Sequence, residues 1–466
     1  MTETGPGTAP ETAERDDLEG LYGVTEELVD AVHDAVHENR HEAIAPLIAG
    51  LHEADLADLL EHLGSADRAV VVEHIPDDIF AEVVSHLDET VREELLEKLD
   101  TRRLAAVVAE LETDDAVDLI EDLDEEDQRE LLDAVPAGDR LLYEEALAWP
   151  EYSAGRLMRR EVVAIPSMWT VGETIDFMRS DTELPDDFYN LVVVDPAHKP
   201  VGTLPVSRVL RSSRPELLTA IMNEDVRPIP VTMDQEDVAF LFRQYAMVEG
   251  PVVDEAGRLV GVITVDDVVE VMEEEHEDDI LKLAGVGEDD YYSAVMATTR
   301  SRFSWLLVNL FTAIAASGVI AFFDAAIEKV VALAVLMPIV ASMGGNAGTQ
   351  TLTVTVRALA TRELSPGGTL RAVAKESLVG FINGVVFAAL MGVITWTWFA
   401  DPILGGVLAT AMVANLLIAG LAGTLIPLGL ERWGADPAVA SGVFLTTVTD
   451  VVGFFVFLGL GSLILL

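Results

Sequence analysis

Five uncharged runs near the carboxyl end constrain this chain of 466 residues more than any other feature. They cover residues 303–323, 330–356, 377–400, 402–430 and 437–466, and Asp450 alone interrupts the last. Each run provides the roughly 20 residues that a helix needs to cross the hydrocarbon core of a bilayer. Because lipid offers no hydrogen bonds to the backbone, such runs fold as helices. The sequence therefore predicts an all-α domain with five membrane spans over 296–466.

Basic residues between the runs predict the orientation of this domain. Five lie in the loops after the second and fourth runs: Arg357, Arg362, Arg371, Lys375 and Arg432. The positive-inside rule places these loops, and with them residues 1–300, in the cytoplasm. Residues 1–20 lack the apolar stretch of a signal peptide, which agrees with that orientation. We expect a multi-pass protein of the cell (plasma) membrane, in contact with lipid, with cytoplasmic amino-terminal domains.

The net charge of −52 is concentrated before the membrane runs. Residues 1–300 hold 73 acidic and 22 basic residues, whereas residues 301–466 hold eight and seven. Only five of the 29 basic residues are lysine, and such an acid-rich, lysine-poor composition is typical of a halophile. So acidic a surface repels phosphates and argues against a nucleic-acid partner. Because cysteine is absent, disulfides and Cys-based metal sites are excluded.

The first part of the chain divides into a tail and a helical domain. Residues 1–25 are rich in Gly, Pro, Thr and Glu and predict a disordered acidic tail. Residues 26–149 repeat short amphipathic units, such as 54–63 and 114–123, that begin with acidic or small residues and carry Leu, Val or Ile on one face. Short repeated helices of this kind predict an α-helical solenoid.

A second repeat, with an offset of 59 residues, follows Pro150. Residues 192–210 match residues 251–269, and each copy has the pattern strand, turn, strand and helix start. This α/β repeat resembles a tandem pair of cystathionine-β-synthase (CBS) domains, which we place at 150–215 and 216–268. CBS pairs usually act as regulators that bind adenine nucleotides or ions. The resemblance therefore implies a regulatory adenine nucleotide such as ATP.

Asp450 is the most informative single residue of the membrane domain. It lies 14 residues after Asp436, about 21 Å along a helix, and no basic residue lies in any of the five runs. A carboxylate at that depth is unfavourable unless it faces a partner or a water-filled path. Thr446 and Thr447 precede it, and hydroxyl and carboxylate oxygens suit Mg²⁺ or Ca²⁺. The alternative is a structural Asp450 that is hydrogen-bonded to the neighbouring threonines.

Polar residues also lie in the second run, within the motif Gly-Gly-Asn-Ala-Gly-Thr-Gln at 344–350. Glycines in mid-membrane are explained by close helix packing. Packing alone does not require Asn346, Thr349 and Gln350 together, so we predict that this segment lines a pore.

Several motifs of the membrane domain resemble those of the MgtE family of magnesium channels. They are the motif at 344–350, Asp436-Pro437 at the start of the fifth run, and Thr-Asp-Val-Val-Gly at 449–453. The order of an acidic helical domain, a CBS pair, a linker helix and five spans is also similar. The resemblance implies a homodimer with a pore between the chains, lined by the second and fifth spans. It also implies that Asp450 is the pore aspartate.

In this resemblance, Asn346 and backbone carbonyls near Thr446 belong to the oxygen wall beside Asp450, and we group Thr447 with them. One departure concerns Gly442, which stands where some family members carry Asn. We therefore do not assign the role of that Asn to Gly442. The divalent cation implied as the transported ion is Mg²⁺. The composition does not distinguish it from Co²⁺ or Ca²⁺.

The acidic segment at 269–295 resembles the plug helix of the same family, and residues 266–284 predict a long helix. The resemblance implies that Mg²⁺ bound along this helix closes the pore. The regulatory ligands it implies are Asp267, Glu270, Glu275, Asp278, Asp279 and Asp436. The alternative is a solvated helix of a halophilic protein. Acidic residues of the helical domain are expected to add further Mg²⁺ sites, which the sequence does not identify.

Three histidines, His33, His37 and His41, recur at intervals of four residues and could place a transition metal on one helix face. Without cysteine or an HExxH motif, solvent-facing histidines are the preferred interpretation. No Walker loop, Ser/His/Asp arrangement or GxGxxG motif was found, so neither an enzyme nor an ATP-driven pump is expected.

The sequence thus predicts a multidomain protein: an α-helical solenoid, an α/β CBS pair, an acidic linker helix and an all-α five-span domain. Its predicted function is Mg²⁺ influx through a dimeric channel that cytosolic Mg²⁺ closes. The main alternative is a proton- or sodium-coupled divalent-cation exchanger or exporter that uses Asp450. A receptor-like membrane regulator without transport is a third.

Overall fold

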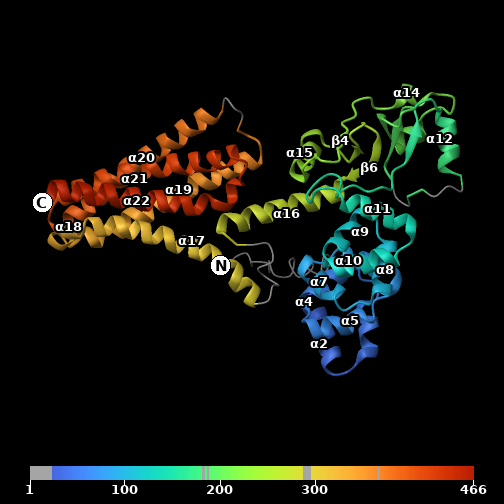
Figure 1. Cartoon of the computed structure of the whole chain (residues 1–466), viewed down its shortest axis with the longest axis horizontal. Helices are drawn as coiled ribbons and strands as arrows, with labels where there is room; N and C mark the ends of the chain where they lie inside the picture. Colours follow the sequence, from blue (N-terminus) through green and yellow to red (C-terminus); the bar gives the residue numbers. More distant parts are fainter. Residues whose placement is uncertain (1–23, 181–183, 186–187, 287–294, 365–367) are drawn as a thin grey trace, which may run out of the picture. The chain divides into compact units, whose positions relative to one another are not determined.

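The computed structural model describes residues 24–180, 184–185, 188–286, 295–364 and 368–466 (Figure 1). The chain forms two compact units, Met1–Met272 and Glu273–Leu466, which we describe separately. The tail predicted over residues 1–25 lies almost wholly outside the described residues.

Short helices build the first part of the amino-terminal unit, as the amphipathic repeats predict. In chain order they are α2 (Glu26–His37), the 3₁₀ turn η1 (His41–Ala43), α3 (Ile44–Ile48), α4 (Glu53–His62), α5 (Ser65–Val72), α6 (Asp77–Ser85), α7 (Glu89–Leu96), α8 (Thr101–Glu110), α9 (Thr113–Glu121), α10 (Glu125–Ala134) and α11 (Ala137–Leu147). Side chains such as Asp88, Asp100 and Asp124 cap the helices that follow them, each accepting a hydrogen bond from a first-turn backbone N–H.

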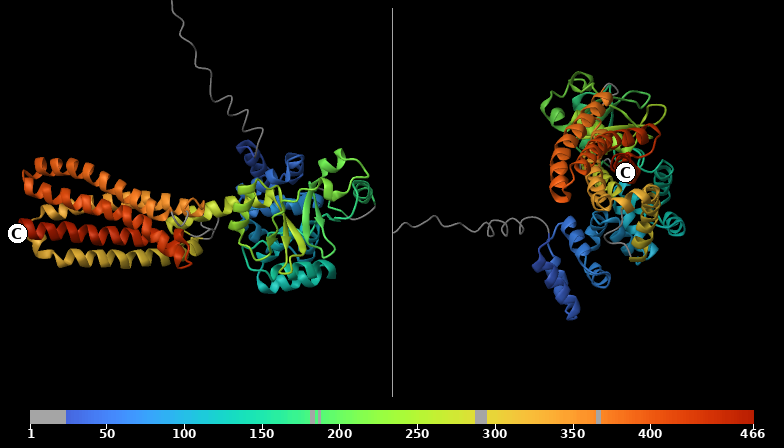
Figure 2. Two further views of the ribbon diagram at one scale, coloured as in Figure 1. Left: turned by 90° about the horizontal axis from the view of Figure 1, so that it is seen from above. Right: turned by 90° about the vertical axis from the view of Figure 1, so that its left-hand side faces the viewer.

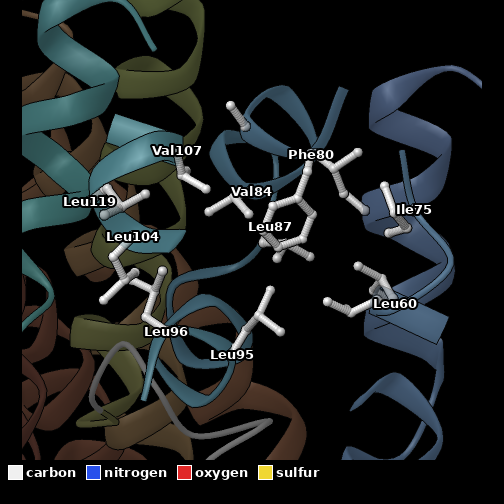
Figure 3. Packing of buried hydrophobic residues seen from close by; sticks show 14 of the residues in the cluster. Leu60, Ile75, Phe80, Val84, Leu87, Leu95, Leu96, Leu104, Val107 and Leu119 are labelled. Carbon is white, nitrogen blue, oxygen red and sulfur yellow. The ribbon is translucent and has the colours of Figure 1, made fainter. Parts of the chain in front are cut away.

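One continuous apolar core joins these helices. Each helix is too short to be stable alone, so it depends on packing its apolar face against its neighbours. Phe80 lies at the centre of the view in Figure 3, with Leu60 on one side and Leu96 and Leu104 on the other. Most of the acidic residues lie on the outer faces, which is why so charged a domain still has a core.

Two small sheets with identical topology form the rest of this unit. The first contains β1 (Ala164–Pro166), β2 (Asn190–Val194) and β3 (Pro200–Pro205), and the second β4 (Ile229–Pro230), β5 (Glu249–Val253) and β6 (Leu259–Thr264). In each sheet the first pair of strands is parallel and the second is antiparallel. The helices that accompany them are α12 (Val171–Met178), α13 (Val206–Arg211), α14 (Leu218–Ile221) and α15 (Gln235–Tyr245). The predicted internal repeat is confirmed.

Equivalent positions of the two repeats meet. Asn190 opens β2 and Glu249 opens β5, 59 residues later, and Asn190 donates hydrogen bonds to the Glu249 carboxylate from its side chain and backbone. Val192 and Val194 share an apolar cluster with Leu259. Burial raises the pKa of Glu249 to about 6, although the bonds from Asn190 oppose the shift.

The acidic helix α16 (Val265–Ala284) leaves the second sheet and continues into the second unit. Asp267, in its first turn, accepts hydrogen bonds from the Thr264 backbone N–H at 3.2 Å and the Thr264 hydroxyl at 2.6 Å. Val268 and Val271 are buried in the core of the second CBS repeat. Packing and capping at its start therefore hold a helix that its own charges would otherwise destabilise.

Five helices of the second unit are long and apolar enough to cross a membrane. They are α17 (Val295–Phe322), α19 (Ala332–Ala360), α20 (Thr369–Phe399), α21 (Pro402–Arg432) and α22 (Pro437–Leu465), and the short α18 (Asp324–Lys329) joins the first two. Figure 2 shows the long helices running side by side. The most buried of them is α21, which packs against α19, α20 and α22. The predicted multi-pass membrane architecture is confirmed.

Candidate ion path and acidic clusters

Asp450 lies near the middle of α22 and is partly buried. Its carboxylate makes no hydrogen bond or ion pair with any residue in the described part of the chain. Thr446 and Thr447 instead donate their hydroxyl hydrogens to their own helix, to the carbonyls of Gly442 at 3.1 Å and Val443 at 2.6 Å. The geometry therefore gives no support to a structural aspartate bonded to its threonines, and it leaves the threonine oxygens able to accept.

The motif of α19 presents two different faces. Gly344 and Gly348 are buried against neighbouring helices, whereas Asn346, Thr349 and Gln350 are exposed on the surface of the single chain. Their polar atoms have few partners among the residues that the structure describes: the Asn346 amide reaches Ser342 Oγ at 3.5 Å, and the Thr349 hydroxyl donates to the Gly345 carbonyl of its own helix. A polar face at membrane depth requires water, an ion or a second protein surface beside it.

Asn415 is a central residue that the sequence analysis missed. It is fully buried on α21 and donates from Nδ2 to the Val340 carbonyl of α19 at 2.7 Å. A Cβ on Gly344 of α19 or on Gly453 of α22 would lie 2.2 or 2.9 Å from Asn415 Nδ2. The glycines of both motifs therefore make room for one amide that joins three helices. The sequence did offer one signal for it: Asn415 is the only Asn in the uncharged run 402–430.

Glycines bring the same helices close elsewhere. A Cβ on Gly348 would lie 2.9 Å from the Leu445 side chain of α22, and one on Gly423 of α21 would lie 2.8 Å from the Gly348 carbonyl. Such small residues permit close approach of helices where lipid provides no hydrophobic drive for association. They hold α19 close to both α21 and α22, so the two helices that carry the polar residues pack together.

One acidic cluster lies at the carboxyl end of α16, within the second unit. The Lys282 ammonium pairs with Asp278 one turn before it and lies 3.3 Å from Asp436 Oδ2 at the start of α22. Asp436 also caps α22 by accepting from the Ala438 N–H at 2.7 Å. Leu283 shares an apolar cluster with Ala438 and Leu445, which holds this end of α16 against the membrane helices.

The charges of this cluster shift one another's pKa values. Burial, together with the charges of Asp436, Asp278 and Glu275, raises the pKa of Asp279 above its usual value. For Lys282, burial opposes the charge, but Asp278 and Asp436 outweigh it and raise the pKa. Four of the predicted regulatory residues are therefore electrostatically coupled here, with a lysine among them that the sequence analysis did not single out.

A second acidic cluster lies at the amino end of α16, within the first unit. The Arg159 guanidinium pairs with Glu112, Asp114, Asp266 and Asp267, at 3.1 Å to Asp114 and 3.0 Å to Asp266. It thereby links α9 and the residue before it to the start of α16. Asp267, which the resemblance implies as a metal ligand, is buried and bonded to Arg159 and Thr264. Arg159 is the second basic residue that sequence reasoning missed.

Carboxylates of the helical domain complete this cluster. One oxygen each of Glu112, Asp114 and Asp115 lies within 4.8 Å of the others. Burial raises the pKa of Asp115 to about 7, and the charges of Asp267, Glu112 and Glu270 add to the shift while Arg159 opposes it. Asp114 Oδ1 is buried without a hydrogen-bond partner among the described residues. Carboxylate oxygens of this kind are the hard ligands that Mg²⁺ and Ca²⁺ prefer.

The structure thus divides the six implied regulatory ligands between the two ends of one helix. Asp267 and Glu270 belong to the cluster around Arg159, whereas Glu275, Asp278, Asp279 and Asp436 belong to the cluster around Lys282. Each cluster already contains one basic side chain.

Comparisons with known proteins match most of the chain. The model of the MgtE family, described as a divalent cation transporter, matches residues 337–460, and that of the MgtE intracellular N domain matches residues 51–152. The CBS domain matches residues 154–214 and 218–274.

Two curated relatives are similar over the greater part of their length. The magnesium transporter MgtE of Thermus thermophilus is 36% identical over 326 residues, which are 69% of this chain and 72% of the relative. That of Bacillus subtilis is 33% identical over 316 residues, 67% of this chain and 70% of the relative. A crystal structure of the cytosolic domain of the Mg²⁺ channel MgtE in complex with ATP is 32% identical and covers 52% of this chain and 99% of its own, with a TM-score of 0.48.

Proposed function

Because this chain belongs to the MgtE family of divalent cation transporters, we propose that it is a homodimeric channel that admits Mg²⁺ and closes when cytosolic Mg²⁺ rises. The observation that carries the proposal is the unpaired carboxylate of Asp450 in the middle of a membrane helix. Placing an isolated carboxylate at that depth in the membrane costs at least about 2–3 kcal/mol, and a water-filled ion path removes most of that cost.

The path is proposed to run between two copies of the chain. Asn346 and Thr446 are exposed on the single chain, on two helices, α19 and α22, that pack together. A second copy would enclose these polar faces and contribute a second Asp450. One carboxylate from each copy suits a Mg²⁺ that keeps most of its water, since this ion dehydrates reluctantly. A membrane potential of 100 mV would drive its two charges inward with about 4.6 kcal/mol.

Closure is proposed to depend on the two acidic clusters of α16. Like charges crowd each cluster, and Mg²⁺ would relieve their repulsion when it bridges them. Asp278, Asp279 and Asp436 would bind it beside the membrane helices, and Asp114 and Asp115 beside the CBS pair. The orphan oxygen Asp114 Oδ1 supports the second assignment. An adenine nucleotide such as ATP at the CBS pair would modulate this response.

The deciding experiment is Mg²⁺ uptake into proteoliposomes at high salt, with an inside-negative potential and low internal Mg²⁺. We expect Asp450→Asn to reduce uptake at least tenfold. Glu328→Gln, which neutralises an exposed carboxylate of the same unit, is the matched control and should transport normally. Equal uptake by Asp450→Asn and the unmodified protein would place the ion path elsewhere.

Two further arms separate the alternatives. At fixed voltage a channel's flux is indifferent to a proton or sodium gradient, whereas a coupled exchanger's flux changes with it. No uptake under any gradient would favour a regulator without transport. Raising internal Mg²⁺ should suppress uptake, and an unchanged rate would exclude the proposed feedback.

A further inference from the structure

A group of side chains far from the proposed ion path gathers between two helices of the amino-terminal unit. His33 Nδ1 on α2 lies 2.8 Å from Asp67 Oδ2 on α5, and His37 Nε2 lies 3.8 Å from the same oxygen. One ligand atom from each of the three residues lies within 4.8 Å of the other two. The two imidazole rings are 4.1 Å apart and nearly perpendicular.

Local structure explains why these groups meet. A spacing of four residues places both histidines on one face of α2. Asp67 stands in the first turn of α5, which packs against α2. The Asp67 side chain is only 11% exposed, whereas those of His33 and His37 are 49% and 60% exposed. A nearly buried carboxylate is thus aimed at two histidines that remain open to solvent on their other side.

The donor set is that of a transition-metal site. Two imidazole nitrogens and one carboxylate oxygen bind Zn²⁺ in many proteins, with water at the fourth position. Ligand atoms about 2.0–2.1 Å from a tetrahedral Zn²⁺ lie roughly 3.3 Å from one another. The observed separations of 2.8 and 3.8 Å lie on either side of that value. We propose that His33, His37 and Asp67 form a site for a transition-metal dication of the Zn²⁺ class, which ties α2 to α5.

This site is chemically distinct from the Mg²⁺ path. Mg²⁺ binds through oxygens and water, whereas imidazole favours Zn²⁺, Co²⁺, Ni²⁺ and Cu²⁺. The proposal therefore does not rest on the proposed function. A hydrogen bond between His33 and Asp67 alone would account for one imidazole but not for the His37 nitrogen, which lies 3.8 Å from the same oxygen.

His41, the third histidine of the sequence pattern, lies outside the proposed site, so its substitution can serve as a control for metal binding. Helix α2 ends at His37, and the chain then turns through Asn39, which has a positive φ of 59°. His41 consequently contacts Asn39 Oδ1 at 2.9 Å and stacks on His74. The possibility that all three histidines share one helix face is excluded, because α2 ends at His37.

The test uses the full chain in detergent, purified without a polyhistidine tag and with millimolar Mg²⁺ present to occupy the oxygen sites. Co²⁺ is titrated as a visible-absorption probe, and Zn²⁺ is then added to displace it. We expect one Co²⁺ per chain with the spectrum of a tetrahedral site, released by one equivalent of Zn²⁺. His37→Gln and Asp67→Asn should each weaken Co²⁺ binding at least tenfold, and His41→Gln should leave it unchanged.

Because the His37 side chain is largely exposed, His37→Gln is expected to fold normally, which circular dichroism without metal would check. Saturating Zn²⁺ should also raise the thermal unfolding midpoint by several degrees in the unmodified protein and in His41→Gln but not in His37→Gln. Absence of stoichiometric binding would overturn the proposal. So would equal affinity in the unmodified protein and in His37→Gln.

Discussion

At the scale of single residues, one buried amide lies where three helices of the membrane unit meet. Asn415 donates across to α19, and its oxygen Oδ1 is buried without a partner among the described residues. Glycines rather than larger residues surround it because the amide needs their space. Polar contacts between membrane helices give modest but directional stabilisation, which selects one packing arrangement.

Gly344→Ala tests this packing. The new Cβ would lie 2.2 Å from Asn415 Nδ2, so the amide or the helix must shift, and we expect a loss of about 1–3 kcal/mol. The measurement is thermal or denaturant unfolding in detergent. Gly345→Ala is the matched control, because apart from its own turn of backbone no described heavy atom lies within 4 Å of its Cβ position. Equal stability of the two variants would contradict the role given to Asn415.

At the scale of elements, the acidic helix α16 contains a basic side chain, Lys282, among its carboxylates. Lys282 partly neutralises Asp278 and Asp436. If the proposed closure is correct, it should therefore not depend on Mg²⁺ alone.

Lys282→Gln should therefore make closure depend more strongly on Mg²⁺. We expect several-fold higher uptake into proteoliposomes at low internal Mg²⁺, with full block retained at high internal Mg²⁺. Lys375→Gln removes an exposed lysine of the same unit and should match the unmodified protein. Lower uptake by Lys282→Gln at low Mg²⁺ would show that the lysine opposes closure.

The contact between the two CBS repeats predicts a pH dependence of stability. The folded protein raises the pKa of Glu249 from the usual 4.5 to about 6, so the folded state holds its proton more tightly than the unfolded state. The unfolding free energy should therefore fall as the pH rises from about 4.5 to 6, and Glu249 should contribute no further slope above that. Thermal unfolding of the unmodified chain and of Glu249→Gln across this range is the measurement. An identical pH slope in both proteins would exclude Glu249 as the cause.

At the scale of the whole molecule, α16 connects the soluble unit with the membrane unit and carries an acidic cluster at each end. In the soluble unit, Arg159 holds helix α9 to the start of α16 through ion pairs with Asp114 and Asp267. The Arg159 guanidinium is part of the chain, so unlike a bound Mg²⁺ it does not dissociate when the Mg²⁺ concentration falls. This junction is therefore expected to persist at low Mg²⁺, and the membrane end to respond more fully.

Arg159→Gln should make the junction depend on Mg²⁺. Its removal leaves carboxylates buried without a counter-charge, which costs on the order of 3–5 kcal/mol. We expect faster limited proteolysis between α11 and β1 without Mg²⁺ and protection when Mg²⁺ is added. Arg258→Gln, which removes an exposed pair with Asp254, is the control. Cleavage that Mg²⁺ does not slow would exclude the cation as a substitute for Arg159.

Much of this protein follows from its sequence alone. The five spans, the short helices and the CBS repeat were predicted because hydrophobic length, period and internal similarity are local properties of a chain. Asp450 was identified for the same reason, because a single charge within an apolar run can be recognised without knowing which residues it contacts. The roles of Asp450, Asn346, Thr446, Thr447 and the acidic ligands of α16 remain predictions.

Tertiary structure alone decided which distant residues meet. Arg159 reaches Asp114 and Asp267 across 45 and 108 residues, and His33 reaches Asp67 across 34. The sequence has 81 acidic residues. No local pattern distinguishes the few carboxylates that pair with one basic side chain from the many that face water. Likewise, the spacing of His41 left open a place on the same helix face as His33 and His37, and only the structure shows that α2 ends before it. Such contacts depend on how helices pack, and packing is set by the whole core rather than by any one segment.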